Sequence, residues 1–291
     1  MESFLYRDGL AAGMGRGSLQ GAAYARPFAG IRSRQELDDA TLLAHAFLLR
    51  LPHRAFYFGR TAAALHGIPL PPMLSDPLPL HVGVVAGTRR VHAQRVVGHH
   101  VRIGPADLTH VGGLPVTTAE RTWCDLAADG ALTVGGLVAA GDRILWRRDP
   151  LGTRESLDAA VDRYDGRRGT RLMRAARPHL SDRADSPPES ELRVAITLAG
   201  LLPPAVNLSI RDATGRLIAT PDLSWPSRRV ALEYEGDHHR VDRDQWHRDI
   251  ERFGRLQEHG WVVLRATSAD YRRPDALLHR LALILTARES T

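Results

Sequence analysis

Hydrophobic and polar positions follow their clearest pattern after residue 186, where they predict an ordered series of helices and strands. Apolar residues recur at helical spacing over residues 189–199, 245–259 and 274–287. Shorter apolar runs typical of strands occupy residues 205–211, 217–223, 229–235 and 261–266. Gly260 ends one helix, and Pro274 begins the last. The predicted order of elements is therefore α-β-β-β-α-β-α.

The first half has a looser pattern that mixes the same two kinds of element. Helical spacing is present over residues 36–50, 61–66 and 134–146, with shorter patches over 7–14 and 18–25. Residues 79–85 and 95–103 are typical of strands. Thr117 and Glu120 have the spacing of a capping box that begins a further helix. Helices and strands in both halves predict an α+β (mixed α/β) fold.

Four segments follow from these patterns. Residues 1–35 are Gly-rich and basic, with only short helical patches, and residues 36–150 are expected to form a mixed α/β domain. Residues 151–185 are helical and dense in arginine, which indicates a connector. Ser186-Pro187-Pro188 then marks the start of the C-terminal domain, residues 186–291. A chain of 291 residues is long enough for two domains of roughly 100–200 residues each.

The basic residues change the range of functions that these domains can have, because all 39 residues in the Lys+Arg count are arginine. The absence of lysine excludes P-loop nucleotide hydrolases, protein kinases and pyridoxal-phosphate enzymes, since each needs a lysine in its site. Genomic base composition is the alternative explanation for an all-arginine chain. The net charge of +6 is nevertheless compatible with a nucleic-acid partner, since arginine binds phosphate through two hydrogen bonds at once.

Cys124 is the single cysteine of the chain, so an intramolecular disulfide and a cysteine-based zinc site are excluded. Its neighbours have a helical pattern, which favours a buried structural thiol. No apolar run approaches the ~18 residues of a membrane-spanning helix, and the N-terminus lacks the apolar core of a signal peptide. We therefore expect a cytoplasmic protein that does not enter a membrane.

Three carboxylates converge on the predicted strands of the C-terminal domain. Glu233 and Glu235 lie two residues apart on one strand, so their side chains share a face, and Asp222 lies near the end of the preceding strand. Adjacent carboxylates repel one another unless cations or protons relieve the charge. Clustered carboxylate oxygens suit Mg²⁺ or Mn²⁺, so the pattern predicts a catalytic metal site of Asp222, Glu233 and Glu235. A solvated, charged strand face is the alternative.

Two further side chains are candidates for the chemistry of this site. Glu189 is either a fourth catalytic carboxylate, supplied by the preceding helix, or the third residue of a capping box that begins at Ser186. His239 follows the third strand closely and is suited to move a proton of the attacking water or of the leaving oxygen. His238 could take the same role, and a histidine that caps a polar loop is the structural alternative.

The candidate DNA-binding residues are arginines near these carboxylates, and they are Arg228, Arg240, Arg243 and Arg252. Their guanidinium groups would hold phosphates of a bound strand. Arg252 has an alternative partner in Asp249, because the two residues lie three apart on one predicted helix.

Taken in order, the motifs of the C-terminal domain resemble a known family. They are Ser186-Pro187-Pro188-Glu189-Ser190-Glu191-Leu192-Arg193, Asp222-Leu223-Ser224-Trp225-Pro226, Glu233-Tyr234-Glu235-Gly236-Asp237-His238-His239-Arg240, Arg248-Asp249-Ile250-Glu251-Arg252 and Gly260-Trp261-Val262-Val263-Leu264-Arg265. Together, over about residues 183–287, they resemble the very-short-patch-repair-endonuclease-like domain of the PD-(D/E)XK (restriction-endonuclease-like) superfamily. The resemblance implies an αβββαβ nuclease fold, with Asp222 and Glu233 as metal ligands and Glu189 as the helix carboxylate.

Glu235 is the departure from this family, because it stands where the superfamily has its lysine. Repair enzymes of this branch dispense with that lysine and use histidine, which favours His239 in the proton role. The same departure also fits a domain that binds DNA without cutting it.

The first half resembles, more loosely, the AbiEi-type antitoxin and transcriptional-regulator proteins. The motifs are Arg60-Thr61-Ala62-Ala63-Ala64-Leu65-His66-Gly67-Ile68-Pro69-Leu70-Pro71, Leu80-His81-Val82, and Gly113-Leu114-Pro115-Val116-Thr117-Thr118-Ala119-Glu120-Arg121-Thr122 with Asp125-Leu126-Ala127. Residues 6–32 look like a shortened winged helix, so residues 1–35 are expected to be a truncated remnant of the DNA-binding module of those relatives.

These features predict a metal-dependent DNA endonuclease that acts in DNA repair or phage defence, with Mg²⁺ or Mn²⁺ as cofactor and DNA as partner. The alternative is a non-catalytic DNA-binding regulator or antitoxin of the AbiEi type. A protein-interaction module in phage defence is a third, weaker hypothesis. A homodimer and a toxin or defence partner are compatible with each of these functions.

Overall fold

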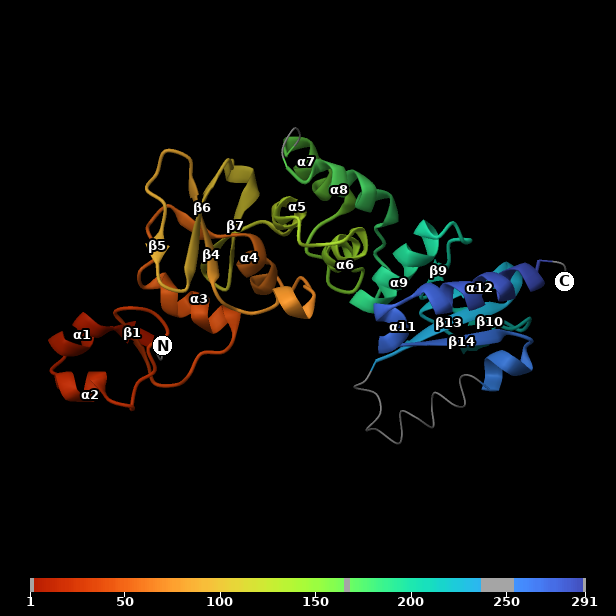
Figure 1. Cartoon of the computed structure of the whole chain (residues 1–291), viewed down its shortest axis with the longest axis horizontal. Helices are drawn as coiled ribbons and strands as arrows, with labels where there is room; N and C mark the ends of the chain where they lie inside the picture. The colour runs from red at the N-terminus through yellow and green to blue at the C-terminus, as the bar shows by residue number, and fades with distance from the viewer. Residues whose placement is uncertain (1–2, 165–167, 237–253, 290–291) are drawn as a thin grey trace. The chain divides into compact units, whose positions relative to one another are not determined.

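The computed structural model describes residues 3–164, 168–236 and 254–289, which form an α+β chain of two compact units (Figure 1). Unit 1 comprises Met1–Leu132 and Leu151–Met173, and unit 2 comprises Thr133–Pro150 and Arg174–Thr291. The predicted connector, residues 151–185, is therefore divided between the units. The helix predicted over 134–146 belongs to the same unit as the C-terminal domain. Among the described residues, we find no helix with both the length and the apolar character that a membrane crossing requires.

Unit 1 is built around a six-stranded mixed sheet with the order β5-β6-β4-β3-β8-β7. The strands are β3 (Ala55–Tyr57), β4 (Leu80–Val85), β5 (His92–Ala93), β6 (Val96–Val101), β7 (Leu108–Val111) and β8 (Leu114–Thr117). The larger helices are α3 (Ala40–Leu48), α4 (Gly59–Leu65), α5 (Ala119–Asp129) and α7 (Arg154–Arg163). Single 3-10 turns form at Pro72–Leu74 and Pro105–Asp107, and α8 (Thr170–Ala176) carries the chain from unit 1 into unit 2.

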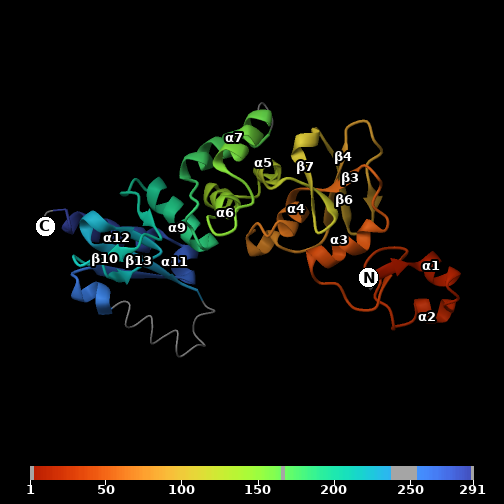
Figure 2. The ribbon, with the colours of Figure 1, turned by 180° about the vertical axis from the view of Figure 1, so that it is seen from behind.

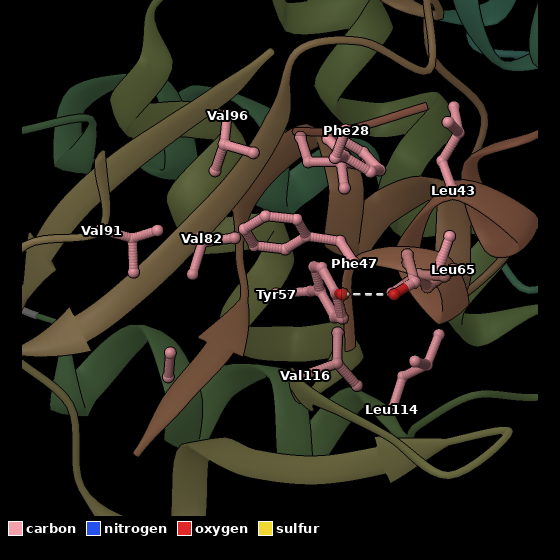
Figure 3. Packing of buried hydrophobic residues seen from close by; sticks show 14 of the residues in the cluster. Phe28, Leu43, Phe47, Tyr57, Leu65, Val82, Val91, Val96, Leu114 and Val116 are labelled. Atoms are coloured by element: carbon pink, nitrogen blue, oxygen red, sulfur yellow. Dashed lines mark hydrogen bonds between the residues drawn. The ribbon is translucent and has the colours of Figure 1, made fainter. Parts of the chain in front are cut away.

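The core of unit 1 brings α3 and α4 together with strands of this sheet (Figure 3). Leu43 and Phe47 of α3 and Leu65 of α4 belong to one buried cluster with Val82 of β4. The hydroxyl of Tyr57, at the end of β3, donates to the carbonyl oxygen of Ala44 at 2.5 Å. A buried hydroxyl that lacked such a partner would cost free energy, so this bond lets a polar ring end lie inside the core.

Residues 3–33 form a small two-stranded sheet and two short helices (Figure 2). Strand β1 (Ser3–Leu5) pairs antiparallel with β2 (Ile31–Ser33), and α1 (Tyr6–Ala11) and α2 (Arg16–Gln20) lie between them in sequence. The helices are shorter than the patches predicted from the sequence. Leu19 and Ile31 are fully buried, and Ile31 belongs to the same buried cluster as Phe47 and Tyr57.

The cap of α5 differs by one residue from the prediction. Thr118 is the N-cap, and its hydroxyl accepts from the backbone N–H of Arg121 at 3.2 Å. Thr117 ends β8 instead, and its hydroxyl lies 2.8 Å from that of Thr122. The predicted capping box of Thr117 with Glu120 is therefore wrong, because the strand continues one residue further than the pattern shows.

Unit 2 contains a four-stranded sheet with the order β14-β13-β12-β9 and a separate β10-β11 hairpin. The strands are β9 (Ala205–Val206), β10 (Ile210–Arg211), β11 (Leu217–Ala219), β12 (Leu223–Trp225), β13 (Val230–Glu235) and β14 (Val262–Thr267), with a 3-10 turn at Pro226–Arg228. The helices are α6 (Val134–Leu145), α9 (Pro187–Leu198), α11 (Ser268–Arg272) and α12 (Asp275–Ala287), with a 3-10 turn at Arg177–His179. Of the helix predicted over 245–259, the described part begins at Gly254 and is helical to Glu258.

The two predicted strands over 205–211 and 217–223 are each divided in the structure. Asn207 has a backbone φ of +45°, which a continuous strand does not allow. Pro221 has no N–H to donate to a neighbouring strand. The first long run therefore becomes β9 and β10, and the second becomes β11 and β12.

The sheet of unit 2 has an apolar layer on each face. On one face, Leu192 of α9 and Leu281 of α12 belong to one buried cluster with Leu232 of β13. On the other face, Ala231 of β13 clusters with Leu256 and with residues of the β10-β11 hairpin. Alternate residues of β13 therefore contribute to opposite layers, and Val230, Leu232 and Tyr234 all belong to the layer of α9 and α12.

Candidate active site

Asp222 and Glu233 are brought side by side by the pairing of β12 with β13. The two strands are antiparallel, with Leu223 opposite Leu232, so the same register continued by one residue places Asp222 opposite Glu233. The backbone N–H of Tyr234 donates to Oδ2 of Asp222 at 2.7 Å. The carboxylate of Asp222 is thereby held against the end of β13, where the sequence predicted that it would join the glutamates.

Glu233 and Glu235 have different surroundings, although they lie on one face of β13. Glu233 is 3% exposed, whereas Glu235 is exposed at the end of the strand. Oε1 of Glu235 lies 3.1 Å from Nε of Arg265 on the parallel strand β14. The charge of Glu235 is therefore balanced by an arginine of the same unit.

Glu189 takes part in the cap of α9. Ser186 is the N-cap, and its hydroxyl lies 3.4 Å from the backbone N of Glu189 and donates to Oε1 of Glu189 at 2.7 Å. The backbone N–H of Asp185 donates to Oε2 of the same side chain at 3.0 Å. Glu189 therefore contacts the N-cap serine, although the backbone N–H that its carboxylate accepts from is that of Asp185 and not that of Ser186, and the residue is 6% exposed.

Asn207, which the sequence did not single out, links this cap to the Asp222 segment. Its side-chain amide donates to Oε2 of Glu189 at 2.8 Å and to the carbonyl oxygen of Arg183 at 2.9 Å. Its backbone N–H donates to the carbonyl oxygen of Asp222 at 2.9 Å. A signal was present, because asparagine is depleted in strands and tolerates positive φ, and Asn207 lies inside a predicted strand.

The described residues fit a metal ion less fully than the sequence predicted. They contain no group of three histidine, cysteine, aspartate or glutamate side chains that could hold a metal ion. Glu235 has Arg265 as its partner, and Glu189 accepts from three donors of its own unit. Asp222 and Glu233 are adjacent carboxylates, and one or two carboxylates are what Mg²⁺ commonly takes from a protein.

Several predicted site residues lie outside the described part of the chain, and they are His238, His239, Arg240, Arg243 and Arg252. Arg228 is described, and its guanidinium forms an ion pair with Glu289. Arg228 lies in the turn between β12 and β13, at the opposite end of β13 from Glu235. The structure therefore does not bring Arg228 together with the carboxylates.

Two proteins of Mycobacterium tuberculosis are similar to this chain over most of its length. They are the uncharacterized proteins MT2308 of strain CDC 1551 / Oshkosh and Rv2248 of strain H37Rv. Each is 30% identical over 258 residues, which cover 88% of this chain and 90% of the relative. The chain belongs to the family of these two proteins. No family model and no solved structure matches it.

The similarity to the MT2308 and Rv2248 family extends over both units. The 258 aligned residues are more than either unit contains, so the alignment includes residues of unit 1 and unit 2. The family therefore shares residues of both units, and not of one unit alone.

A buried carboxylate, Asp142, joins α6 to α9 within unit 2. It is 2% exposed and accepts from the hydroxyl of Ser190 at 2.6 Å, from the backbone N–H of Ser181 at 2.7 Å and from the guanidinium of Arg193. Burial raises the pKa of Asp142 to about 6, and Arg193 opposes that rise. These contacts hold the parts of unit 2 together and identify Asp142 as structural, although no motif in the sequence marks it.

A histidine pair lies in unit 1, where His81 of β4 is close to His99 of the neighbouring strand β6. Nδ1 of His81 and Nε2 of His99 are 3.0 Å apart, and their rings stack with centroids separated by 5.1 Å. Burial lowers the pKa of His81 to about 4, with further lowering by His99 and Arg60, while Asp129 opposes it. His81 is therefore neutral near pH 7 and shares a hydrogen bond with His99.

Cys124 and Glu191 complete the comparison with the sequence. Cys124 is buried in α5 and burial raises the pKa of its thiol, in agreement with a structural role. Glu191 of α9 lies two residues after Glu189. It is only partly exposed and accepts from the hydroxyl of Tyr271 on α11 at 2.9 Å, a contact between distant segments that helical spacing does not reveal.

Proposed function

We propose that this protein is a metal-dependent DNA endonuclease of the very-short-patch-repair-like type, with its catalytic residues in unit 2. The observation that carries the proposal is the position of Asp222 opposite Glu233 at the end of β12 and β13. Two adjacent carboxylates, one of them almost fully buried, are oxygen donors of the kind that Mg²⁺ commonly takes from a protein. The order α9-β9-β12-β13-β14, with the described helical turn before β14, is compatible with the αβββαβ fold that the resemblance implies.

The residues of the chain have distinct tasks in this proposal. Asp222 is oriented by the N–H of Tyr234, and Glu233 supplies a second oxygen donor from inside the sheet. Glu189 keeps the start of α9 next to the Asp222 segment through Asn207, so it positions that segment. Mg²⁺ or Mn²⁺, when bound, polarises a phosphoryl oxygen and lowers the pKa of a water molecule. The role of His239 in proton transfer and the roles of Arg240, Arg243 and Arg252 in phosphate binding remain predictions.

The biological setting is part of the same proposal. DNA as the partner is supported by the net charge of +6 and by arginine as the only strongly basic residue type. A place in DNA repair or phage defence, a cytoplasmic location, a homodimer and a toxin or defence partner are each predictions that accompany it.

The second candidate function is a non-catalytic DNA-binding regulator of the AbiEi type. The ion pair between Glu235 and Arg265 favours it, because it removes one of the three predicted metal ligands. Under this hypothesis unit 2 is a binding platform, and the short helices and two-stranded sheet of residues 3–33 contribute to DNA contact.

A plasmid-nicking assay separates the two functions. The wild-type chain is incubated with supercoiled plasmid and Mg²⁺ or Mn²⁺, and the conversion to open circles is measured beside DNA binding. We expect nicking by the wild type and by Glu258→Gln, which changes an exposed carboxylate of unit 2, and no nicking by Asp222→Asn with DNA binding retained. DNA binding without nicking under either cation, in wild type and variants alike, would support the regulator and reject the nuclease.

A further inference from the structure

Unit 2 contains a pocket of about 380 Å³ between the start of α6, one side of α9 and the junction of α11 with α12. Its walls are largely apolar, with Val134, Val194, Leu198 and Pro274 among the lining residues. Pockets that bind small molecules commonly have about 300–1,000 Å³ and a few polar groups on an apolar surface. This pocket has the size and the kind of surface that a small ligand requires.

Glu191 is the one charged side chain among the residues that line this pocket. Its Oε1 accepts from the hydroxyl of Tyr271, which is the other ionisable residue of the lining. That bond occupies one carboxylate oxygen, and a carboxylate has about four lone-pair sites in all. Glu191 therefore keeps the capacity to accept further hydrogen bonds from a donor in the pocket.

The position of Glu191 depends on the close approach of α6. A Cβ atom added at Gly135 would lie 3.3 Å from Cγ of Glu191 and 3.5 Å from its Cα. A glycine at the first turn of α6 therefore lets the helix pack directly on the glutamate. The carboxylate is partly removed from water by this packing, and burial raises its pKa while the hydroxyl of Tyr271 opposes the rise.

We propose that this pocket binds an organic cation, in the form of a primary ammonium group on an apolar body. The ammonium would pair with the carboxylate of Glu191, and the apolar body would lie against Val194, Leu198 and Pro274. No arginine lines the described pocket, so an anionic ligand would meet an unrelieved negative charge. A partly desolvated carboxylate also prefers a cation to a neutral group, because the ion pair offsets the cost of its burial.

This site is separate from the proposed catalytic carboxylates, and its test does not depend on them. The ring of Tyr271 meets the ring of Tyr234 edge to face with centroids 6.1 Å apart, and it is the backbone N–H of Tyr234 that holds Asp222. The pocket and the candidate active site thus share one structural neighbour. Ligand binding is measured directly, so the proposal stands or falls whether or not the protein cuts DNA.

Isothermal titration with phenethylamine and hexylamine tests the proposal on the full chain. The matched probes are 2-phenylethanol, which lacks the charge, and 3-phenylpropionate, which reverses it. We expect both amines to bind at one site and the alcohol and the acid to bind at least about tenfold more weakly, as the loss of a charge-assisted hydrogen bond implies. Equal binding of amine and alcohol would overturn the proposal, as would an absence of amine binding.

Three variants assign that binding to the pocket. Glu191→Gln keeps the shape and removes the charge, and it should lose about tenfold in amine affinity. Ala195→Leu fills the pocket without a change in charge and should lose amine binding as well. It provides an independent test if Glu191→Gln is too unstable to be measured. Glu258→Gln, an exposed carboxylate of the same unit, should bind as the wild type does. Amine binding that survives in both pocket variants would place the site elsewhere and reject the proposal.

The affinity of the pocket for an amine should decrease as the pH is lowered. The pKa of Glu191 is raised, so its carboxylate takes up a proton at a higher pH than an ordinary glutamate, and amine affinity should fall as pH falls through that range. The elements around Glu191 contribute one other ionisable group to the pocket, Tyr271, whose pKa is raised by burial and by Glu191. Tyr271 therefore stays neutral over the range, and an affinity that rises as the solution is acidified would contradict the role of Glu191.

Discussion

Asn207 donates its side-chain amide to Oε2 of Glu189 at 2.8 Å and its backbone N–H to the carbonyl oxygen of Asp222 at 2.9 Å. One residue with a positive φ thus connects the first turn of α9 to the residue that precedes β12. The candidate active site therefore depends on a residue that carries no reactive group.

Replacement of Asn207 should lower the stability of unit 2. Asn207→Gly keeps the backbone conformation and removes the amide, so it should cost about 1–3 kcal/mol, the range for hydrogen bonds that include one to a charged group. Asn207→Ala should cost about 1–2 kcal/mol more, because alanine has a Cβ in the left-handed region. Urea unfolding measures both, and an alanine variant as stable as the glycine variant would show that the positive φ is not retained.

The pair of Asp142 and Arg193 should be far more sensitive to a single substitution than to a double one. Asp142→Leu leaves the guanidinium of Arg193 buried without its partner and should cost about 3–5 kcal/mol. Asp142→Leu with Arg193→Met replaces both charges by apolar groups and should recover much of that loss. The exposed pair of Arg143 and Asp149 is the control, and Asp149→Asn should change stability by less than about 1 kcal/mol. A double variant that is no more stable than Asp142→Leu would contradict this.

The N-caps of α9 and α6, both in unit 2, should differ in how much they stabilise the protein. Ser186→Ala removes the hydroxyl that contacts both the backbone N and Oε1 of Glu189, and Thr133→Ala removes the hydroxyl that caps α6 at Gly136. Loss of a cap costs about 1 kcal/mol, and Ser186→Ala should exceed Thr133→Ala because it also leaves a buried carboxylate with one donor fewer. Thermal unfolding of the two variants decides the order, and the reverse order would show that the contact with Oε1 adds nothing.

Unit 1 should lose stability as the solution is acidified below neutral pH. The pKa of His81 is lowered from 6.5 to about 4, so the folded state excludes a proton that the unfolded chain binds below pH 6.5. The contribution of His81 is present above pH 6.5 and is lost as pH falls towards 4. His81→Asn should flatten the dependence of the melting temperature on pH over that range, and His110→Asn, an exposed histidine of the same unit, should not. Identical pH profiles for wild type and His81→Asn would show that the pair does not contribute.

The long elements of the fold were predictable because their residues repeat a pattern. Helix α12 follows the apolar spacing of residues 274–287, and α6 that of 134–146, within one or two residues of the observed ends. The three-residue strand β3 is too short to show any period, and it was missed although Tyr57 is fully buried. The assignment of α6 to a unit was not predictable either, since it depends on packing against α9, where the partner of Asp142, Arg193, lies 51 residues away.

The candidate site likewise contains contacts that local sequence predicts and contacts that it does not. The adjacency of Asp222 and Glu233 follows from two neighbouring strands joined by a short turn, which local sequence describes well. The pairing of Glu235 with Arg265 needs the parallel register of β13 and β14, and that register is set by the whole unit. The contact of Glu191 with Tyr271 spans 80 residues, so no window of sequence contains both.

The chain leaves unit 2 after residue 150 and returns to it at residue 174. This arrangement sets the order in which the two units can be completed during synthesis on the ribosome. Residues 133–150 of unit 2 are synthesised before residues 151–173, which finish unit 1. Until α9 follows, Asp142 lacks its contacts with Ser190 and Arg193, and α6 lacks the helix that it packs against in the finished chain. A nascent chain therefore exposes the apolar surface and the unpaired carboxylate of α6 at a stage when unit 1 can already complete its folding. A fragment that begins at residue 151 or 186 would lack that helix altogether.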